Sequence, residues 1–194
     1  SIVEELRRRG HNPTIIYNTN GYELASTLRL LEGIVDVWLP DFKYSDDALA
    51  LELSGAPRYS EYAQAALKEM VHQVGTTLHT DDRGIARRGI IIRHLVLPGL
   101  VENSVGVLKL IAEQISLNLH ISLMSQYYPP DRIEAQTLNS QIVNRKSLHR
   151  PINRPEYETL LEAFHSLGFT RGWLQEYESH RNYRPDFSRD HPFE

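Results

Sequence analysis

Asp41 and Lys43 are the residues whose types and spacing most directly suggest chemistry. They stand two positions apart in the segment PDFKY, so in an extended strand both side chains lie on the same side. A carboxylate and an ammonium group placed in this way can meet the opposite charges of a zwitterionic ligand such as an amino acid. A plain ion pair at the end of a strand carries equal weight at this stage.

A second polar segment, NTNG, places Asn18 and Asn20 on either side of Thr19. Gly21 permits a close backbone approach, so the two amides and the neighbouring carbonyl groups can hold an ammonium or a hydroxyl group. A simple turn, in which an Asn side chain bonds its own backbone, explains the same motif equally well.

Arg93 and His94 interrupt the apolar run GIIIRHLVL. A guanidinium group in a parallel-sheet strand must find a carboxylate or other acceptors, because an unpaired buried charge is strongly destabilising. Successive strand residues point to opposite faces, so only one of the two side chains is expected to face a barrel interior. A purely structural pair between Arg93 and a carboxylate is the alternative to ligand binding.

Tyr127 and Tyr128 follow a further apolar run and can offer an aromatic face to a base or a sugar. Tyrosines at the end of a strand more often serve in packing. The sequence contains no glycine-rich phosphate loop, no His-Glu zinc motif and no serine nucleophile elbow.

His79, Asp81 and Asp82 supply nitrogen and oxygen atoms that can bind a metal ion. Together with His94 they define a metal-dependent hydrolase as one alternative function. Because they lie beside Arg83 in a charged segment, a solvated loop is the favoured interpretation, and no metal ligand is assigned.

The composition excludes several classes of protein. The chain has 194 residues, a net charge of -4 and no cysteine, so these residues form no disulfide, thiolate metal site or cysteine nucleophile. The lack of a broad basic field argues against nucleic acid as a partner. No apolar stretch approaches the roughly 20 residues of a membrane helix. A soluble protein without membrane contact is expected, with the cytoplasm as the default compartment because no signal peptide is visible.

The elements that must position these residues alternate between strand and helix. The patterns predict strands at 14–17, 34–39, 89–97, 119–124 and 173–176, and helices at 22–31, 61–74, 103–115 and 156–167. Asn103 or Ser104 is placed to cap the third helix. Apolar strands that alternate with helices favour an α/β fold with a mostly parallel sheet flanked by helices, in which ligands bind at the carboxyl ends of the strands.

The two ends of the chain and the edge of the sheet complete this prediction. The segment IVEELRRRG reads as the last turns of a helix stopped by Gly10, so further natural sequence is expected to precede it. We expect one domain over 1–177 and an extended C-terminal tail over 178–194. With fewer strands than a full barrel, the sheet has an open edge through which a homo-oligomer can form.

The order of the motifs resembles a known family. YNTNGY, VDVWLPDFKY, KEMVHQVG, RGIIIRHLVLPG, SLMSQYYP and a tail of the form NYRPDF…HPF together resemble the radical S-adenosylmethionine proteins related to pyruvate formate-lyase activating enzyme. The similarity covers nearly the whole chain and is greatest to a less characterised branch whose substrates are unassigned.

The resemblance implies a partial (β/α)6, TIM-like barrel with a [4Fe-4S] cluster and S-adenosylmethionine at the carboxyl ends of its strands. Reductive cleavage of the sulfonium would give a 5′-deoxyadenosyl radical, which in the activating enzymes abstracts hydrogen from a glycine of a partner protein. The implied partners are therefore a glycyl-radical-type enzyme and an electron donor.

By motif position, the resemblance implies that Asn18 and Thr19 lie near the methionine amino group. Asn20 belongs to the same candidate cofactor-binding turn. The resemblance places Asp41 and Lys43 near the methionine carboxylate or the ribose.

The same reasoning by motif position places Arg93 near the methionine carboxylate and Leu95 near the adenine. Tyr127 stands where the activating enzymes usually have a histidine, and it completes the set of candidate cofactor-binding residues. These assignments agree with the independent expectation of a site for a zwitterion attached to a nucleoside.

Two motifs of the family are absent from these residues. One is the C-x3-C-x2-C loop that ligates the cluster, and the other is the glycine-rich GGE segment. In the family, both normally precede the part of the sequence that these residues resemble. The chain therefore resembles the C-terminal part of such an enzyme, and by itself it is expected to be catalytically inactive and to bind the cofactor weakly. A cluster-free binding or interaction domain on the same scaffold is the further alternative.

Overall fold

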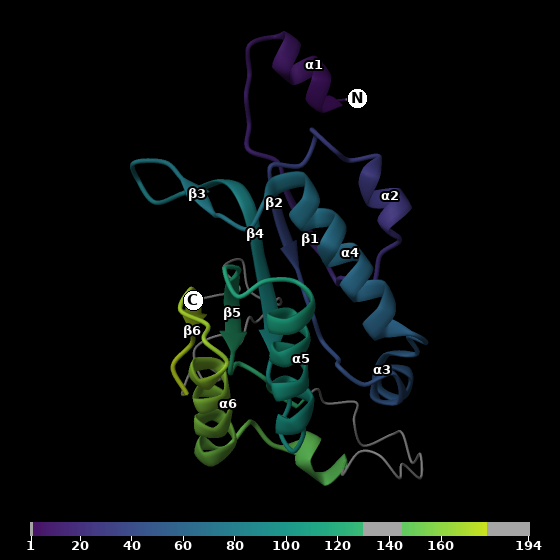
Figure 1. The fold of residues 1–194 in the computed structure, drawn as a ribbon, viewed down its shortest axis with the longest axis vertical. Helices are drawn as coiled ribbons and strands as arrows, with labels where there is room; N and C mark the ends of the chain where they lie inside the picture. Colours follow the sequence, from purple (N-terminus) through teal and green to yellow (C-terminus); the bar gives the residue numbers. More distant parts are fainter. Residues whose placement is uncertain (1, 130–144, 178–194) are drawn as a thin grey trace, which may run out of the picture.

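A mostly parallel sheet forms the centre of the computed structural model, which describes residues 2–129 and 145–177 (Figure 1). Within those residues the sheet has six strands, five of them in the order β1-β2-β4-β5-β6 with every neighbouring pair parallel. The sixth, β3, runs antiparallel to β4. The strands are β1 (Ile16–Thr19), β2 (Val37–Pro40), β3 (His79–Thr80), β4 (Ala86–Leu95), β5 (His120–Met124) and β6 (Gly172–Leu174).

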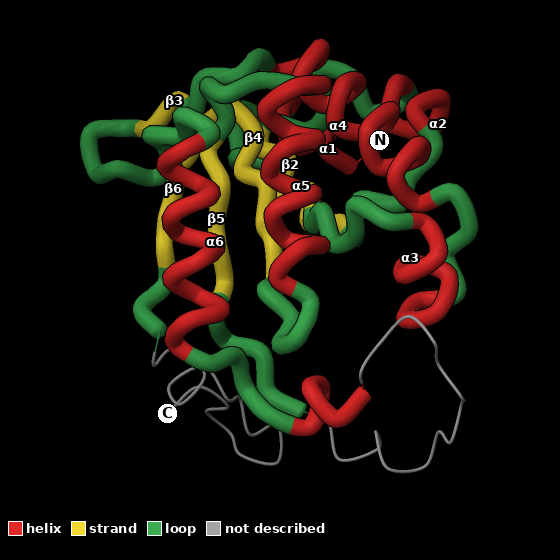
Figure 2. The backbone as a smooth tube through the Cα atoms, turned by 60° about the horizontal axis from the view of Figure 1, so that its bottom comes forward, coloured by secondary structure: helices red, strands yellow, loops and turns green. Residues whose placement is uncertain are grey.

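Helices connect the parallel strands, as crossover connections between parallel strands require. Helices α4, α5 and α6 lie over the same face of the sheet in both views (Figures 1 and 2). The described helices are α1 (Ile2–Arg8), α2 (Ala25–Arg29), α3 (Asp47–Ser54), α4 (Tyr59–Val74), α5 (Val101–Gln114), α6 (Arg154–Ser166) and the short 3-10 helix η2 (Arg145–His149).

The alternation of side chains along β4 separates the core from the opposite face of the sheet. Ile90 and Ile92 are fully buried, whereas the residues between and after them, Ile91 and Arg93, remain partly exposed. Burying each isoleucine stabilises the fold by about 1.5–3 kcal/mol. The helix-covered face therefore provides stability, while the other face leaves polar side chains accessible at the carboxyl ends of the strands.

The expected α/β class is confirmed, as are the five predicted strands and the four predicted helices, with shifted ends. Three elements were missed: α3, the short helix η2, and the hairpin that pairs β3 with the beginning of β4. The predicted cap of α5 was wrong. The helix begins at Val101 after Leu100, and no side chain caps it. The predicted tail, 178–194, lies outside the described residues.

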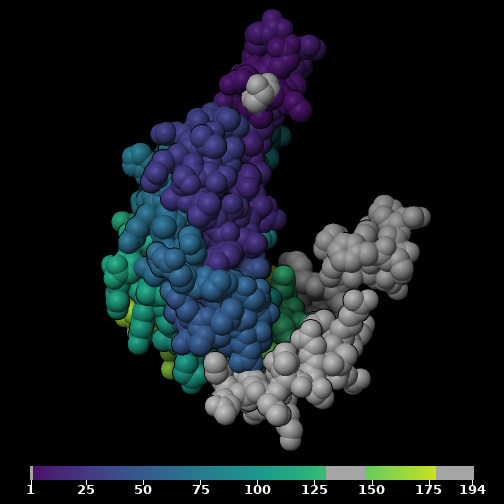
Figure 3. Space-filling view, turned by 90° about the vertical axis from the view of Figure 1, so that its right-hand side faces the viewer, coloured from purple at the N-terminus to yellow at the C-terminus, as the bar shows by residue number. Residues whose placement is uncertain are grey.

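The N-terminal helix α1 projects from the body of the molecule (Figure 3). It buries none of its residues and ends before Gly10, whose φ of +80° suits a helix stop. Arg7 connects α1 to the segment before β2. It donates to the carbonyl oxygens of Gly33 and Ile34 and forms an ion pair with Asp36. Among the described helices, none is long and apolar enough to cross a membrane.

Candidate functional site

Arg93 links the ends of three neighbouring strands. Its Nε donates to Asp41 Oδ1 at 2.8 Å, and its Nη2 lies 2.6 Å from the same oxygen. Nη2 also donates to Asn18 Oδ1 at 2.8 Å. Since Arg93 pairs with Asp41 in parallel register, and Asn18 is the last but one residue of β1, the parallel sheet itself brings the three side chains together.

Lys43 approaches the same carboxylate from the other side. Its Nζ lies 3.3 Å from Asp41 Oδ2, so one carboxylate serves two cations and the three side chains together carry one positive charge. The two ion pairs that offer an alternative to ligand binding, Asp41–Lys43 and Asp41–Arg93, are therefore both present. Lys43 and Arg93 nevertheless keep 40% and 27% of their side-chain surface exposed, which leaves donors available to an anionic group.

The NTNG turn lies beside this cluster, and the side chains of Thr19 and Asn20 already bond residues that follow closely in the chain. Thr19 Oγ1 donates to Glu23 Oε1 at 2.6 Å, and Asn20 Oδ1 accepts from the backbone N–H of Tyr22 at 3.0 Å. For Asn20, the interpretation as a simple turn is therefore the one observed. Gly21 has a φ of +76°, and a Cβ there would lie 2.0 Å from the carbonyl oxygen of Asp41.

A cavity of about 390 Å³ opens over the cluster. Asp41, Lys43 and Arg93 form its charged side, and Leu95, also predicted from the sequence, lies on its wall. The remaining lining residues are Tyr44, Ser54, Leu97, Met124 and Gln126. The site thus combines a charged end with an apolar wall, as a ligand with a zwitterionic end and a flat apolar end requires.

His94 points to the opposite face and is fully buried. Its Nδ1 lies 2.6 Å from the carbonyl oxygen of Phe42, and its Nε2 lies 2.8 Å from Ser104 Oγ. Because a carbonyl only accepts, Nδ1 carries the proton. Burial lowers the pKa of His94 and favours the neutral ring, so Nε2 accepts from Ser104. As expected, one of the two neighbours, Arg93 and not His94, faces the site.

The residues proposed for a hydrolase do not assemble. His79 and Asp81 lie at the hairpin that joins β3 to β4, at the end of β4 away from the cavity. Asp81 accepts from the backbone N–H groups of Ile85 and Arg83 and pairs with Arg87, which together lower the pKa of its carboxyl group. No group of three His, Asp or Glu side chains in the described part of the chain can hold a metal ion.

Tyr127 lies apart from the cavity wall. Its hydroxyl donates to the carbonyl oxygen of Leu148 at 2.9 Å, its ring packs against the core, and burial raises its pKa. In this structure Tyr127 therefore serves in packing, which is the alternative to a role as an aromatic platform for a ligand.

The sequence did not reveal three further polar residues that line the cavity, Tyr44, Ser54 and Gln126. Tyr44 and Ser54 bond each other through their hydroxyls at 2.7 Å, and Gln126 accepts from Gln175 at 3.0 Å. Tyr44 and Gln126 belong to motifs that were already singled out, so their position next to the charged residues was the available signal. Ser54 lies in α3, which the sequence patterns did not predict.

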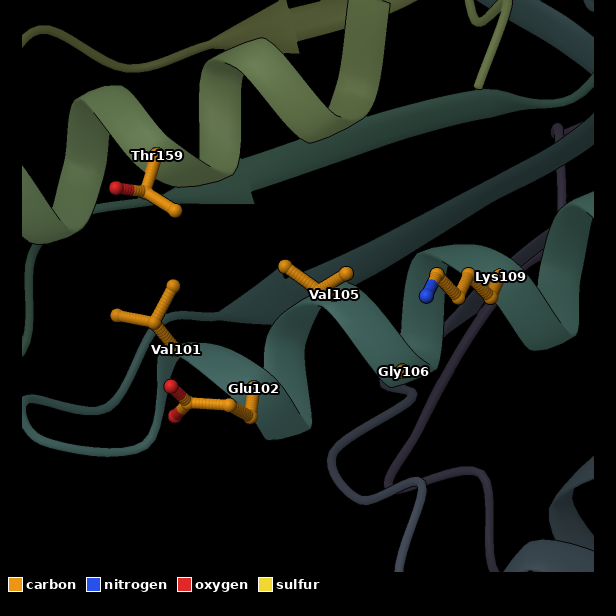
Figure 4. A pocket seen from close by; sticks show the side chains of 6 residues that line it. All are labelled: Val101, Glu102, Val105, Gly106, Lys109 and Thr159. Carbon is orange, nitrogen blue, oxygen red and sulfur yellow. The ribbon is translucent and has the colours of Figure 1, made fainter. Parts of the chain in front are cut away.

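A second depression lies between α5 and α6, on the outer side of the helical layer (Figure 4). Its volume is about 260 Å³ and none of the predicted site residues lines it. The lining residues are Val101, Glu102, Val105, Gly106, Lys109 and Thr159.

Comparison with known proteins identifies a relative but no family. No family model matches the chain. An uncharacterized protein of Methanocaldococcus jannaschii is 27% identical to it over 157 residues, which correspond to 79% of this chain. The chain spans 40% of the length of that relative. Since the name of the relative states no activity, the resemblance to the activating enzymes stays a prediction.

Proposed function

We propose that this chain is the C-terminal part of a radical S-adenosylmethionine enzyme of the activating-enzyme type, and that the cavity binds the cofactor. The observation that carries the proposal is the cluster of Asp41, Lys43 and Arg93, which lines a cavity with an apolar wall. Its net positive charge suits a carboxylate, and Asp41 and the amide oxygen of Asn18 suit an ammonium group.

In this proposal the residues take the roles that the resemblance implies. Arg93 and Lys43 bind the methionine carboxylate or the ribose, while Asn18 and Thr19 lie toward the methionine amino group. Leu95, together with Leu97 and Met124 on the same wall, packs against the adenine. In the family that the chain resembles, S-adenosylmethionine is the source of the radical. What these residues contribute is the orientation of that cofactor.

The residues of this chain do not fit a [4Fe-4S] cluster. Such clusters are held by cysteine thiolates, and the chain has no cysteine. The ligands would have to come from outside these 194 residues. We therefore expect that anaerobic reconstitution of this chain with iron and sulfide leaves no bound cluster, and a stoichiometric cluster on these residues would contradict the proposal.

Ligand titration followed by NMR tests the site. We expect S-adenosylmethionine to bind with a dissociation constant on the order of 0.1 mM, weak because part of the proposed site is missing. The substitution Arg93→Met should weaken this binding about tenfold, to the level of 5′-methylthioadenosine, which lacks the amino acid end.

Arg87→Met is the matched control. Arg87 lies on the same strand and also pairs with an aspartate, but at the hairpin. Its loss should leave the affinity unchanged. Failure of the wild-type chain to bind S-adenosylmethionine at 5 mM, about fifty times the expected dissociation constant, or equal losses in the two variants, would overturn the assignment of the cavity.

A second candidate, an interaction domain without a cluster, is favoured by the edges of the sheet. Ile16 on the edge strand β1 is 55% exposed and Trp173 on the edge strand β6 is 51% exposed. Unpaired edges with apolar side chains invite association. Concentration-dependent dimerisation in sedimentation experiments, abolished by Ile16→Lys and accompanied by no cofactor binding, would favour this function over the first.

A further inference from the structure

Residues 42–45 leave the sheet directly after Asp41. The backbone N–H of Phe42 donates to the carbonyl oxygen of Arg93 at 2.9 Å, which is the last bond of this segment to a described neighbouring strand. Beyond it, the backbone groups of Phe42, Lys43 and Ser45 bond side chains instead. The segment that carries Lys43 thus depends on side chains for its position.

Two of these side chains come from β4 and α4. His94 Nδ1 donates to the carbonyl oxygen of Phe42 at 2.6 Å, and the Tyr59 hydroxyl accepts from the backbone N–H of Lys43 at 2.8 Å. His94 is fully buried and Tyr59 is 2% exposed, so neither can exchange its partner for water.

The third side chain comes from the first turn of α5. Asn103 Nδ2 donates to the carbonyl oxygen of Lys43, and Asn103 Oδ1 accepts from the backbone N–H of Ser45, both at 2.9 Å. One turn later, a Cβ at Gly106 would lie 2.3 Å from Ser45 Oγ and 2.8 Å from Ser45 Cβ. The backbone of α5 therefore packs directly against the segment.

None of Tyr59, His94 and Asn103 lines the cavity. They are anchored in three different elements and together bond four backbone groups of residues 42–45. The Tyr59 hydroxyl also lies 3.5 Å from the carbonyl oxygen of Asp41. They can therefore affect the site through the backbone that carries Asp41 and Lys43. A displacement of that backbone by about 1 Å would separate Lys43 from Asp41 and from any ligand carboxylate, a misplacement that can cost up to about 100-fold in function.

We propose that Tyr59, His94 and Asn103 are positioning residues, here called the bracing residues, that hold Lys43 and Asp41 ready for the charged end of the ligand. The inference rests on the proposed function for the identity of that ligand. It predicts that loss of a bracing residue harms the binding of S-adenosylmethionine more than the binding of 5′-methylthioadenosine, because only the former carries the amino acid end.

Amide hydrogen exchange tests the bracing without any ligand. Tyr59→Phe should speed exchange at the amide of Lys43 at least tenfold, and Asn103→Leu should do so at the amide of Ser45. Ile111→Val is the control, since Ile111 is a buried core residue of the same helix. Unchanged exchange at Lys43 and Ser45 in the two variants overturns the inference, whether or not the protein binds S-adenosylmethionine.

A double-mutant cycle separates positioning from general destabilisation. Asn103→Leu should weaken S-adenosylmethionine binding about tenfold in the wild-type background and less than twofold in a Lys43→Met background, because its effect passes through Lys43. Equal losses in the two backgrounds would show that Asn103 only stabilises the fold. Tyr59→Phe, which keeps the ring, serves the same cycle if Asn103→Leu fails to fold.

Gly106→Ala provides a test that removes no hydrogen bond. Alanine favours a helix over glycine, but its Cβ would displace Ser45. We expect about fivefold weaker binding of S-adenosylmethionine with unchanged helix content by circular dichroism. Unchanged affinity would overturn the role of the contact between α5 and the segment. If the wild-type chain binds no S-adenosylmethionine, the proposed function fails, while the exchange experiment still decides the bracing.

Discussion

The two ends of β4 carry the same ion pair in different settings. At the amino end, Arg87 Nη2 lies 2.7 Å from Asp81 Oδ2, and at the carboxyl end Arg93 Nη2 lies 2.6 Å from Asp41 Oδ1. Asp81 is six residues from its partner and belongs to the hairpin, whereas Asp41 is 52 residues from its partner and follows a different strand.

The difference shows that the type of ion pair does not decide its role. The carboxylate of Asp81 is occupied by the backbone of its own turn and by Arg87. That of Asp41 faces a cavity and is shared with Lys43. Arg87 also donates to Thr14 Oγ1 at 2.8 Å, but that contact lies away from the cavity. Because parallel strands gather their carboxyl ends at one edge, the second pair meets Asn18 and Lys43 beside the cavity.

The largest difference in stability is expected between substitutions of two glycines, Gly21 and Gly84, which have the same φ of +76°. Gly21→Ala should destabilise the protein by at least about 3 kcal/mol, because its Cβ would lie 2.0 Å from the Asp41 carbonyl oxygen in addition to the backbone strain. Gly84→Ala, in the hairpin turn with open space around it, should cost only about 1 kcal/mol. Urea unfolding of both variants measures this, and similar costs would contradict the crowding at the carboxyl end.

The arginines provide the next largest contrast. Arg93→Met leaves the 20%-exposed side chain of Asp41 with Lys43 alone and should cost about 1–2 kcal/mol of unfolding free energy. Arg87→Met should cost about 0.5 kcal/mol, since the Arg87 side chain is 44% exposed and Asp81 keeps its backbone donors. Chemical unfolding checks both values. A larger cost for Arg87→Met would reverse the comparison.

Tyr127→Phe tests whether the candidate site at the carboxyl ends of the strands includes Tyr127. The loss of the hydrogen bond to the Leu148 carbonyl oxygen should cost about 1 kcal/mol. The affinity for S-adenosylmethionine should not change, because Tyr127 does not line the cavity. Thermal unfolding and the NMR titration measure the two quantities. Weaker binding would return Tyr127 to the adenosine contact that the resemblance implies.

The smallest expected effect is a difference between the two ends of β4 in how the unfolding free energy depends on pH. Burial lowers the folded-state pKa of His94 from its ordinary value of 6.5, and burial and Arg171 lower that of His120. The unfolded chain therefore binds more protons as the pH falls from 7.5 to 6, and the unfolding free energy decreases. His94→Gln should reduce this dependence in urea unfolding series. Equal pH slopes for wild type and His94→Gln would contradict a buried neutral ring.

At the hairpin, the contribution of Asp81 to the unfolding free energy should be lost only at a lower pH than that of His94. The carboxyl pKa of Asp81 is lowered from 3.8, chiefly by the Ile85 N–H and then by Arg87. Its contribution to stability is present above the unfolded-state value and is lost as the pH falls through the lower folded-state value. Asp81→Asn should therefore leave the slope between pH 7.5 and 6 unchanged and reduce only the loss of stability below about pH 4.

Much of the framework could be predicted from the sequence. Apolar runs such as GIIIRHLVL identify strands that are buried on one face, and Leu95 and Arg93 fall on the opposite face by alternation alone. The charged cluster was also predictable, because Asp41 and Lys43 directly follow a predicted strand and Arg93 lies within an apolar strand, where it needs a carboxylate partner. The hairpin at His79–Thr80 was not, since two polar residues carry no strand pattern and pair only through β4.

By itself, the sequence determined the class of fold, the approximate positions of five strands and the candidates Asp41, Lys43 and Arg93, because periodicity and charge are local properties. Only the tertiary structure decided which polar residues line the candidate site and which lie behind it. Asn103 reads as a helix cap in sequence, yet it bonds Lys43 and Ser45, about 60 residues away. Tyr127 reads as a ligand contact, yet it bonds Leu148. Such partners depend on packing between distant elements, which no local pattern records.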